Sequence, residues 1–168
     1  MSVCGPAGGK GRFAQLQWLF PVAVTLHNAE EAIWLPSWVA RHSAQLPWHV
    51  PAVPFRLALA ALTAIAYMLT LLSRKRGLES GWTYAFLGYV VAMFLNVFVP
   101  HVPATILFRG YTPGVVTAVV LNLPVTALLL ARAFQQRVLP NRTVTAFVLG
   151  VPLAIALSFA LLIATLSR

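Results

Sequence analysis

The sequence predicts an all-α integral membrane protein, built as a bundle of about five transmembrane helices with an interfacial connector and a short re-entrant segment. Hydrophobic residues make up 60% of the 168 residues and charged residues only 9%. Soluble domains are about 45–50% apolar and about 25% charged. The mean hydropathy is +0.81, and the apolar runs are separated by basic or proline-containing segments. This composition excludes a soluble enzyme or a soluble DNA-binding domain.

The chain divides into a flexible leader over residues 1–12 and one transmembrane helical domain over residues 13–168. The first span is predicted at 13–39. Basic residues precede it, as they precede a signal peptide, but the stretch Leu26-His27-Asn28-Ala29 lacks the small-x-small cleavage pattern. We therefore interpret this run as a retained helix.

Four further spans are predicted at 55–73, 82–99, 114–134 and 144–166, each long enough to cross the hydrocarbon core. Arg41–Pro54 is predicted to be an interfacial connector. The prolines of Pro100-His101-Val102-Pro103 are expected to end the third span, because each proline removes a backbone donor. The segment Ala104–Tyr111 is too short to cross and is interpreted as re-entrant or interfacial.

Charge predicts orientation and partners. The formal net charge is +9, with the basic residues between apolar runs, which indicates membrane lipids as partners and no nucleic acid. Five spans place eight basic residues on the side of the N-terminus and four on the other, which predicts a multi-pass protein of the bacterial inner membrane with a cytoplasmic N-terminus. The single cysteine, Cys4, forms no intrachain disulfide and leaves the redox compartment open.

Two of the three acidic residues, Glu30 and Glu31, are adjacent inside the first predicted span. A charged side chain near the centre of a membrane helix costs roughly 2.5–3.5 kcal/mol. Two neighbouring carboxylates repel each other as well. A proton, an arginine or a metal ion must therefore neutralise them, and an ionisable pair at this depth indicates a functional site.

His27 precedes these residues by three and four positions, so the three side chains share one helix face. His27, Glu30 and Glu31 are therefore candidate catalytic acid–base groups. Together with His101, which follows the third span at the same side of the membrane, they are candidate ligands of zinc, iron or manganese. A protonated or arginine-paired structural network is the alternative for the same residues.

Other polar residues concentrate in the same half of the membrane, whereas the opposite halves of the spans are nearly pure Leu, Ala, Val and Phe. The candidates for binding the polar end of a substrate are Asn96, Arg109, Tyr111 and Asn122. The two asparagines have an alternative role as hydrogen-bonding contacts between helices, which contribute about 0.6 kcal/mol each.

The motif His27-Asn28-Ala29-Glu30-Glu31 resembles that of the HXXEE-domain family of small bacterial membrane proteins. The resemblance covers nearly the whole chain after the leader. It includes the stretch FLNVFVPHVPATILFRGYTPGVV, with Asn96, His101, Tyr111, Pro113 and Gly114 as the counterparts. The family has no established activity, so the resemblance implies a motif and a membrane topology and no reaction.

Three classes of function fit these residues. The first is a membrane enzyme, metal-dependent or acting by acid–base chemistry, for a small hydrophobic substrate such as a lipid or isoprenoid. The second is a proton- or cation-coupled carrier, although the chain shows no internal repeat of the kind that transporters usually have. The third is a structural membrane protein with a packed polar network. The sequence favours the enzyme.

Overall fold

The computed structural model describes residues 13–46, 49–142, 144–150, 152–153 and 157. Within this part of the chain every regular element is helical. In chain order the elements are α2 (Leu19–Arg41), α3 (Ala52–Arg76), α4 (Gly81–Asn96), η1 (Val97–His101), α5 (Val102–Leu107), α6 (Val115–Thr117), η2 (Ala118–Asn122) and α7 (Leu123–Gln135). The predicted all-helical fold class is confirmed.

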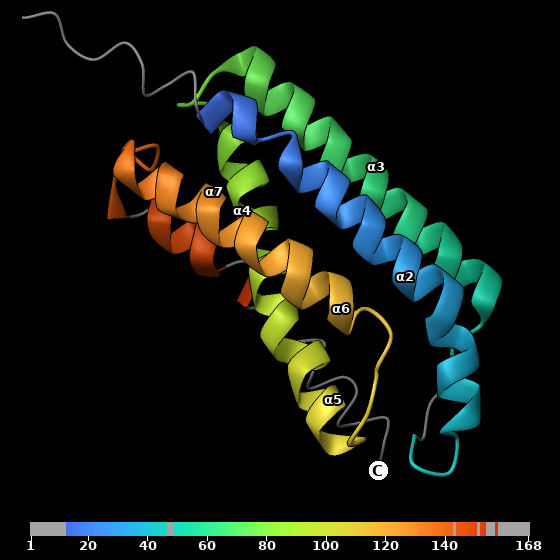
Figure 1. The fold of residues 1–168 in the computed structure, drawn as a ribbon. Coiled ribbons are helices and arrows are strands. Elements are labelled where there is room, and N and C mark those ends of the chain that lie inside the picture. Colours follow the sequence, from blue (N-terminus) through green and yellow to red (C-terminus); the bar gives the residue numbers. More distant parts are fainter. Residues whose placement is uncertain (1–12, 47–48, 143, 151, 154–156, 158–168) are drawn as a thin grey trace, which may run out of the picture.

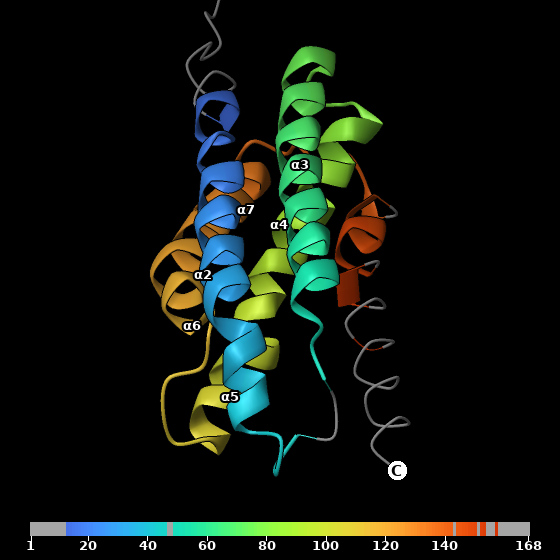
Figure 2. The same ribbon diagram turned by 90° about the vertical axis from the view of Figure 1, so that its right-hand side faces the viewer.

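The long helices pack side by side in sequence order, α2 on α3, α3 on α4 and α4 on α7 (Figure 1). The segment α6–η2–α7 returns along α2, so the chain's first and last long helices are neighbours (Figure 2). This return brings residues near position 30 against residues near position 117. Helices that are distant in sequence therefore meet around α2.

Among the described residues, three helices are long and apolar enough to cross a membrane: Ala52–Arg76, Gly81–Leu107 and Val115–Gln135. They support a membrane protein. The helix α2 has 23 residues, which is the length of a span, but His27, Asn28 and the two glutamates lower its hydropathy. The predicted first span is therefore a helix that carries the polar residues of the bundle.

The main core lies between α2, α3, α4 and α7. Phe13, Phe20 and Phe86 are fully buried there, and Phe20 meets Phe86 edge-on with ring centroids 5.3 Å apart. The outer faces of the helices are apolar as well, with exposed side chains such as Leu57 and Val120. An exposed apolar face is what a bilayer stabilises, because lipid tails are as apolar as leucine.

The helical run that begins at Gly81 is interrupted before Pro100, as predicted for the end of the third span, but a further helix follows directly beyond the interruption. The helix bends at Val99, whose φ of −147° and ψ of 109° are extended, and it resumes as α5. A residue before proline is disfavoured in the α region, which explains the position of the bend. The first half of the expected separate segment Ala104–Tyr111 thus belongs to the helix α5, which ends at Leu107, and the second half is non-helical.

A widened turn, η2, interrupts the fourth predicted span. Pro124 lies two residues after this π-helical turn, at the start of α7. A proline inside a helix has no N–H to donate and its ring clashes with the carbonyl four residues earlier, here Val120. The π-helical turn accommodates both effects, and such turns occur frequently at functional sites.

A buried polar cluster lies at the end of the bundle where α3 ends and α4 begins. The sequence predicts nearly pure apolar residues in this half of the spans, so the cluster corrects that expectation. Gln17 is fully buried, and its Nε2 donates to Ser73 Oγ at 2.7 Å. Ser73 Oγ lies 2.7 Å from Thr83 Oγ1, whose hydroxyl donates to the carbonyl of Gly77. These contacts join the N-terminal turn, the end of α3 and the start of α4. The periodicity of the sequence does not reveal them, because each residue alone is compatible with an apolar helix.

Several predicted boundaries can be compared with the helices. The first span was predicted at 13–39; residues 13–16 are helical and α2 extends to Arg41. Within the predicted connector Arg41–Pro54, residues 42–46 and 49–51 form a non-helical link, whereas Arg41 belongs to α2 and residues 52–54 belong to α3. Residues 47–48 lie outside the described part. The leader over 1–12 and most of the fifth span over 144–166 also lie outside it; residues 144–150 are helical.

Candidate functional site

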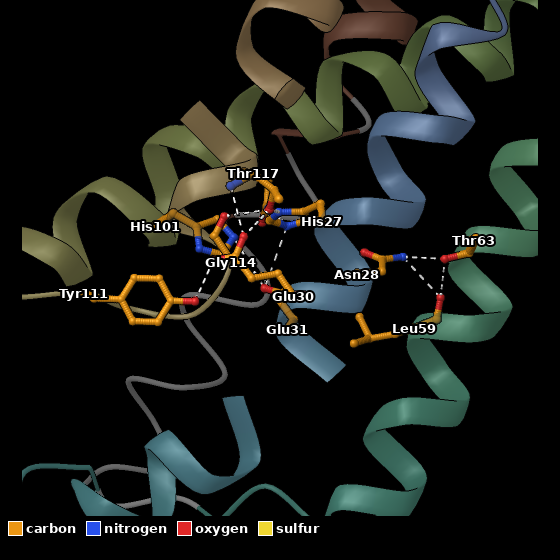
Figure 3. A network of polar contacts seen from close by, with 11 residues as sticks. His27, Asn28, Glu30, Glu31, Leu59, Thr63, His101, Tyr111, Gly114 and Thr117 are labelled. Atoms are coloured by element: carbon orange, nitrogen blue, oxygen red, sulfur yellow. Dashed lines mark hydrogen bonds and ion pairs between the residues drawn. The ribbon is translucent and has the colours of Figure 1, made fainter. Parts of the chain in front are cut away.

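A cluster of two histidines and one glutamate lies where α2 meets the bend of the third long helix. His27, Glu31 and His101 each offer a ligand atom, and these atoms all lie within 4.8 Å of one another (Figure 3). Glu31 Oε1 is 3.8 Å from His27 Nε2 and 3.4 Å from His101 Nε2. The two imidazole rings are nearly perpendicular, with centroids 4.8 Å apart. We call these three residues the His/Glu cluster.

The helix spacing and the bend bring these side chains together. His27 and Glu31 are one turn apart on α2, as their separation of four residues requires. His101 is the last residue of η1 and reaches the cluster because the helix bends at Val99 and continues beyond Pro100. Its Nε2 is buried and has no hydrogen-bond partner within the described residues. Burying a polar nitrogen without a hydrogen-bond partner costs free energy. Because His101 Nε2 also lies beside the Glu31 carboxylate, a cation bound between the two would offset this cost.

Glu30 points away from the cluster, toward the loop before α6. It accepts three hydrogen bonds, from Tyr111 Oη at 2.7 Å, from the Thr117 N–H at 3.0 Å and from Thr117 Oγ1 at 2.5 Å. All three contacts are donated to the carboxylate, and such contacts stabilise its negative charge. The two adjacent glutamates therefore have different surroundings: Glu31 faces the histidines and Glu30 anchors the loop.

Thr117 connects Glu30 to the His/Glu cluster. Its hydroxyl donates to Glu30, and the same oxygen lies 3.0 Å from His27 Nδ1. Because that hydroxyl proton is already donated, the contact with the ring requires His27 Nδ1–H as the donor. His27 Nε2 then carries the lone pair, which faces Asn96 Nδ2 at 3.1 Å and the Glu31 carboxylate. A carboxylate that acts on a histidine in this way fixes its tautomer, as in many metal sites.

Gly114 lets the loop approach the cluster closely. It has φ +90°, in the left-handed region that favours glycine. A Cβ on Gly114 would lie 3.0 Å from Glu31 Cγ and would overlap His101 Cε1. The loop backbone thus covers the cluster at a distance that no other residue type permits.

Tyr111 lies in the same loop, outside the helices, and its phenol is 49% exposed. Partial burial, followed by its hydrogen bond to Glu30, raises the pKa of Tyr111 above the usual range for a phenol. Tyr111 is therefore protonated across the physiological pH range, in agreement with its role as the donor to Glu30.

Asn28 shows how α2 is oriented. Its Nδ2 donates to the Leu59 carbonyl at 3.2 Å and to Thr63 Oγ1 at 2.8 Å, both on α3 (Figure 3). Asn28 therefore attaches one face of α2 to α3, while His27 and Glu31 occupy the face toward α6 and the bend. The motif thus divides its polar residues between packing and the cluster.

The donor atoms of the cluster fit a divalent transition metal. Two imidazole nitrogens and one carboxylate oxygen form a ligand set found in catalytic zinc sites and in non-heme iron sites. In a tetrahedral site with bonds of about 2.1 Å, ligand atoms lie about 3.4 Å apart. The distances from Glu31 Oε1 to the two histidines, 3.4 and 3.8 Å, are near this value. The three ligand atoms together lie within 4.8 Å of one another, so a bound ion would draw them closer together. Three protein ligands leave a coordination position for a further group.

Most of the residues predicted for the site are in or beside it. Asn96 and Tyr111 contact His27 and Glu30, respectively. Asn122 is fully buried at the end of η2, and neither of its amide atoms has a partner within the described residues. Arg109 lies elsewhere, on a separate depression with His42 and Phe108. Within the described part of the chain no arginine pairs with Glu30 or Glu31, which disfavours the arginine-neutralised network.

Thr117 and Gly114 are residues of the site for which the sequence predicts no catalytic, substrate-binding or metal-binding role. A threonine in an apolar helix normally bonds to its own backbone, so it attracts no attention. Gly114 has a recognisable signal, since it follows a proline at the start of a span. The close approach itself becomes visible only when the loop, α2 and the bend are placed together.

The fold and the cluster define a helical membrane protein with a polar site formed by two histidines and a glutamate. The chain belongs to the HXXEE family: the family described as "Protein of unknown function with HXXEE motif" matches residues 18–129. In this chain the motif residues are His27, Glu30 and Glu31.

A relative from Bacillus subtilis (strain 168), "Uncharacterized protein YrkK", is 32% identical over 120 residues, which cover 71% of this chain and 75% of the relative. No solved structure matches the chain. The matched region contains the whole segment from α2 to the middle of α7, which includes the cluster, the bend and the loop before α6.

Proposed function

We propose that the protein is a multi-pass enzyme of the bacterial inner membrane that uses the His/Glu cluster, with a divalent metal ion, to act on a lipid or isoprenoid-like substrate. The observation that carries the proposal is the convergence of His27, Glu31 and His101 within 4.8 Å. The chain has only three acidic residues and four histidines. Two of the acidic residues and two of the histidines lie at one point of an apolar bundle, which favours chemistry over helix packing.

The residues around the cluster have distinct roles in this proposal. His27, Glu31 and His101 hold the metal ion, and a bound zinc, iron or manganese ion supplies Lewis-acid chemistry. Glu30 is not among the three clustered ligands, and we assign it to a position beside them, where the Thr117 hydroxyl links it to His27. From there it orients His27 and is the nearest carboxylate able to accept a proton.

The surroundings of the cluster support a hydrophobic substrate. Ile33 and Trp34 follow Glu31 on α2 and are 58% and 52% exposed, and Val116 beside Thr117 is 53% exposed. Glu31 itself is 15% exposed. An apolar rim around a polar centre suits a molecule that enters from the lipid phase and brings its polar end to the cluster. Asn96 and Asn122 are the candidates to orient that polar end.

The orientation in the membrane follows from the loop charges. Arg74 at the end of α3 donates to the carbonyl of Ala14, so the first described turn and this basic end are on the same side. Figure 1 shows the last turn of α7, which contains Arg132, at the same end of the bundle as the end of α3, and the last turn of α2, which contains Arg41, at the other end. The excess of basic residues supports a cytoplasmic location for the N-terminal end.

Comparative lipid analysis tests the proposed activity. Membranes from cells that produce the wild-type protein are compared by mass spectrometry with membranes that contain equal amounts of Glu31→Gln or His101→Gln protein. We expect at least one lipid or isoprenoid species to be consumed, and a product to appear, only with the wild-type protein. Identical lipid profiles for all three proteins, with metal bound by the wild type, would contradict an enzyme of this class and favour the carrier.

A further inference from the structure

A depression of about 530 Å³ lies at the end of the bundle where α2 and α5 end. Its lining residues are His42, Gln45, Leu46, Leu107, Phe108 and Arg109. The aromatic rings hold its two sides together: Trp38 stacks on His42 with centroids 4.3 Å apart and meets Phe108 edge-on at 4.7 Å. The depression is therefore fixed by packing between two helix ends that are distant in the sequence.

The backbone at Arg109 is held in an unfavourable conformation. Its φ is +50°, in the left-handed region. The N–H of the following residue, Gly110, donates to the Thr105 carbonyl at 3.2 Å, which is the pattern of a Schellman helix end. Glycine is the usual residue at the left-handed position, and a side chain there costs roughly 1 kcal/mol. This backbone conformation places the Arg109 guanidinium at the edge of the depression.

The lining has the chemistry of an anion site with an apolar wall. Arg109 offers five N–H donors in a planar arrangement that suits phosphate oxygens, and Gln45 adds an amide donor. His42 Nδ1 donates to the Trp38 carbonyl at 2.8 Å and so satisfies one of the last carbonyls of α2. None of the six lining residues is acidic. Leu46, Leu107 and Phe108 provide the apolar side.

The depression lies at the depth where lipid headgroups are found. Leu107 is the last residue of the candidate span Gly81–Leu107, and Arg41, at the end of α2, adds a further positive charge nearby. Phospholipids place their phosphates at this boundary, and a basic residue near the surface attracts anionic lipid by about 1 kcal/mol. A soluble anion such as inorganic phosphate has no apolar part to pack against Leu46, Leu107 and Phe108.

We propose that this depression binds the phosphate headgroup of an anionic phospholipid, with Arg109 and Gln45 on the phosphate and Leu46, Leu107 and Phe108 against the glycerol and the first acyl carbons. The site is distinct from the His/Glu cluster and does not depend on the activity proposed for it. It gives Arg109, which does not reach the cluster, a defined ligand.

The variant Arg109→Gly tests the proposal without endangering the fold, because glycine favours the left-handed backbone. Arg137→Gly is its matched control. Arg137 also has φ +50° after a helix, and the next residue, Val138, donates to the Ala133 carbonyl in the same way, but Arg137 does not line the depression. Both variants are titrated in neutral detergent with short-chain phosphatidylglycerol, with phosphatidylcholine of equal chain length and with inorganic phosphate. Native mass spectrometry counts the bound molecules.

We expect wild type and Arg137→Gly to bind phosphatidylglycerol about equally, and Arg109→Gly to bind it about fivefold more weakly. Phosphatidylcholine and inorganic phosphate are expected to bind weakly to all three proteins. Equal losses in the two variants would show a general effect of positive charge and overturn the proposal. Inorganic phosphate binding as tightly as phosphatidylglycerol would overturn the lipid as the ligand, and unchanged binding by Arg109→Gly would overturn the site itself.

Discussion

His27 Nδ1 and Thr117 Oγ1 lie 3.0 Å apart, although the two residues are 90 positions apart in the sequence. The threonine hydroxyl donates a hydrogen bond of 2.5 Å to the Glu30 carboxylate, so its oxygen is left to accept from the imidazole. With the proton of His27 on Nδ1, the lone pair is on Nε2, the ring nitrogen that faces Glu31 and His101. Glu30, the first glutamate of the motif, therefore contributes to the cluster from outside it.

The first prediction concerns this hydroxyl. Thr117→Val keeps the shape of the side chain and removes the link, so His27 loses its preferred tautomer. We expect metal affinity to fall about 10–100-fold, as for other partners of histidine ligands. Chelator competition measures the affinity. Thr117→Ser retains the hydroxyl and is expected to restore binding to near the wild-type level, and an equal loss in both variants would show that only packing had been disturbed.

The second prediction separates the two glutamates. Glu31→Gln removes a ligand of the cluster and is expected to abolish stoichiometric metal binding. Glu30→Gln removes a charge that touches the cluster only through Thr117, so we expect about tenfold weaker binding with the stoichiometry retained. Elemental analysis gives the stoichiometry and chelator competition gives the affinity. The assignment of roles fails if Glu30→Gln loses all metal while Glu31→Gln keeps it.

The third prediction concerns the close approach of the loop. Gly114→Ala places a Cβ against His101 and Glu31 and strains a backbone of φ +90°, which costs roughly 1–2 kcal/mol before the clash is counted. We expect lost metal binding and a lower melting temperature in detergent. Gly110→Ala is the control, because its Cβ would make only an ordinary contact at 3.7 Å with the Phe108 carbonyl. Similar effects of the two variants would argue against a special role for Gly114.

The fourth prediction concerns the other polar cluster. Ser73→Ala removes the partner of Gln17 Nε2 and leaves a fully buried amide without hydrogen bonds. We expect the free energy of unfolding in detergent to fall by about 1–3 kcal/mol, with unchanged metal affinity, since this cluster joins the opposite helix ends. A change in metal affinity without a change in stability would contradict a purely structural role.

Much of the fold and part of the cluster could be predicted from the sequence. Composition and apolar runs predicted the helical membrane class, because bilayer thickness fixes the length of a span. The spacing of His27 and Glu31 placed both on one helix face. His101 could be assigned to the same region because the third span is interrupted beside it, at Val99.

The rest depended on contacts between segments distant in the sequence. No local pattern distinguishes a threonine that bonds to its own helix from Thr117, which bonds to Glu30 and His27. No local pattern shows that Glu30 faces the loop while Glu31 faces the histidines. Neighbouring residues differ by about 100° around a helix, but the sequence does not tell which segment lies against each side. The contact between Gln17 and Ser73 could not be predicted for the same reason, because it joins helix ends that are distant in the sequence.

The measurement that tests the central claim most directly is elemental analysis of the purified protein, carrying an affinity tag free of histidine, beside its His27→Ala and Glu31→Gln variants. We predict near-stoichiometric zinc, iron or manganese in the wild-type protein and none in either variant, with all three proteins inserted and folded. Absence of metal from a wild-type protein purified without chelators and supplied with each ion in turn would contradict the metal site, and with it the role assigned to the His/Glu cluster.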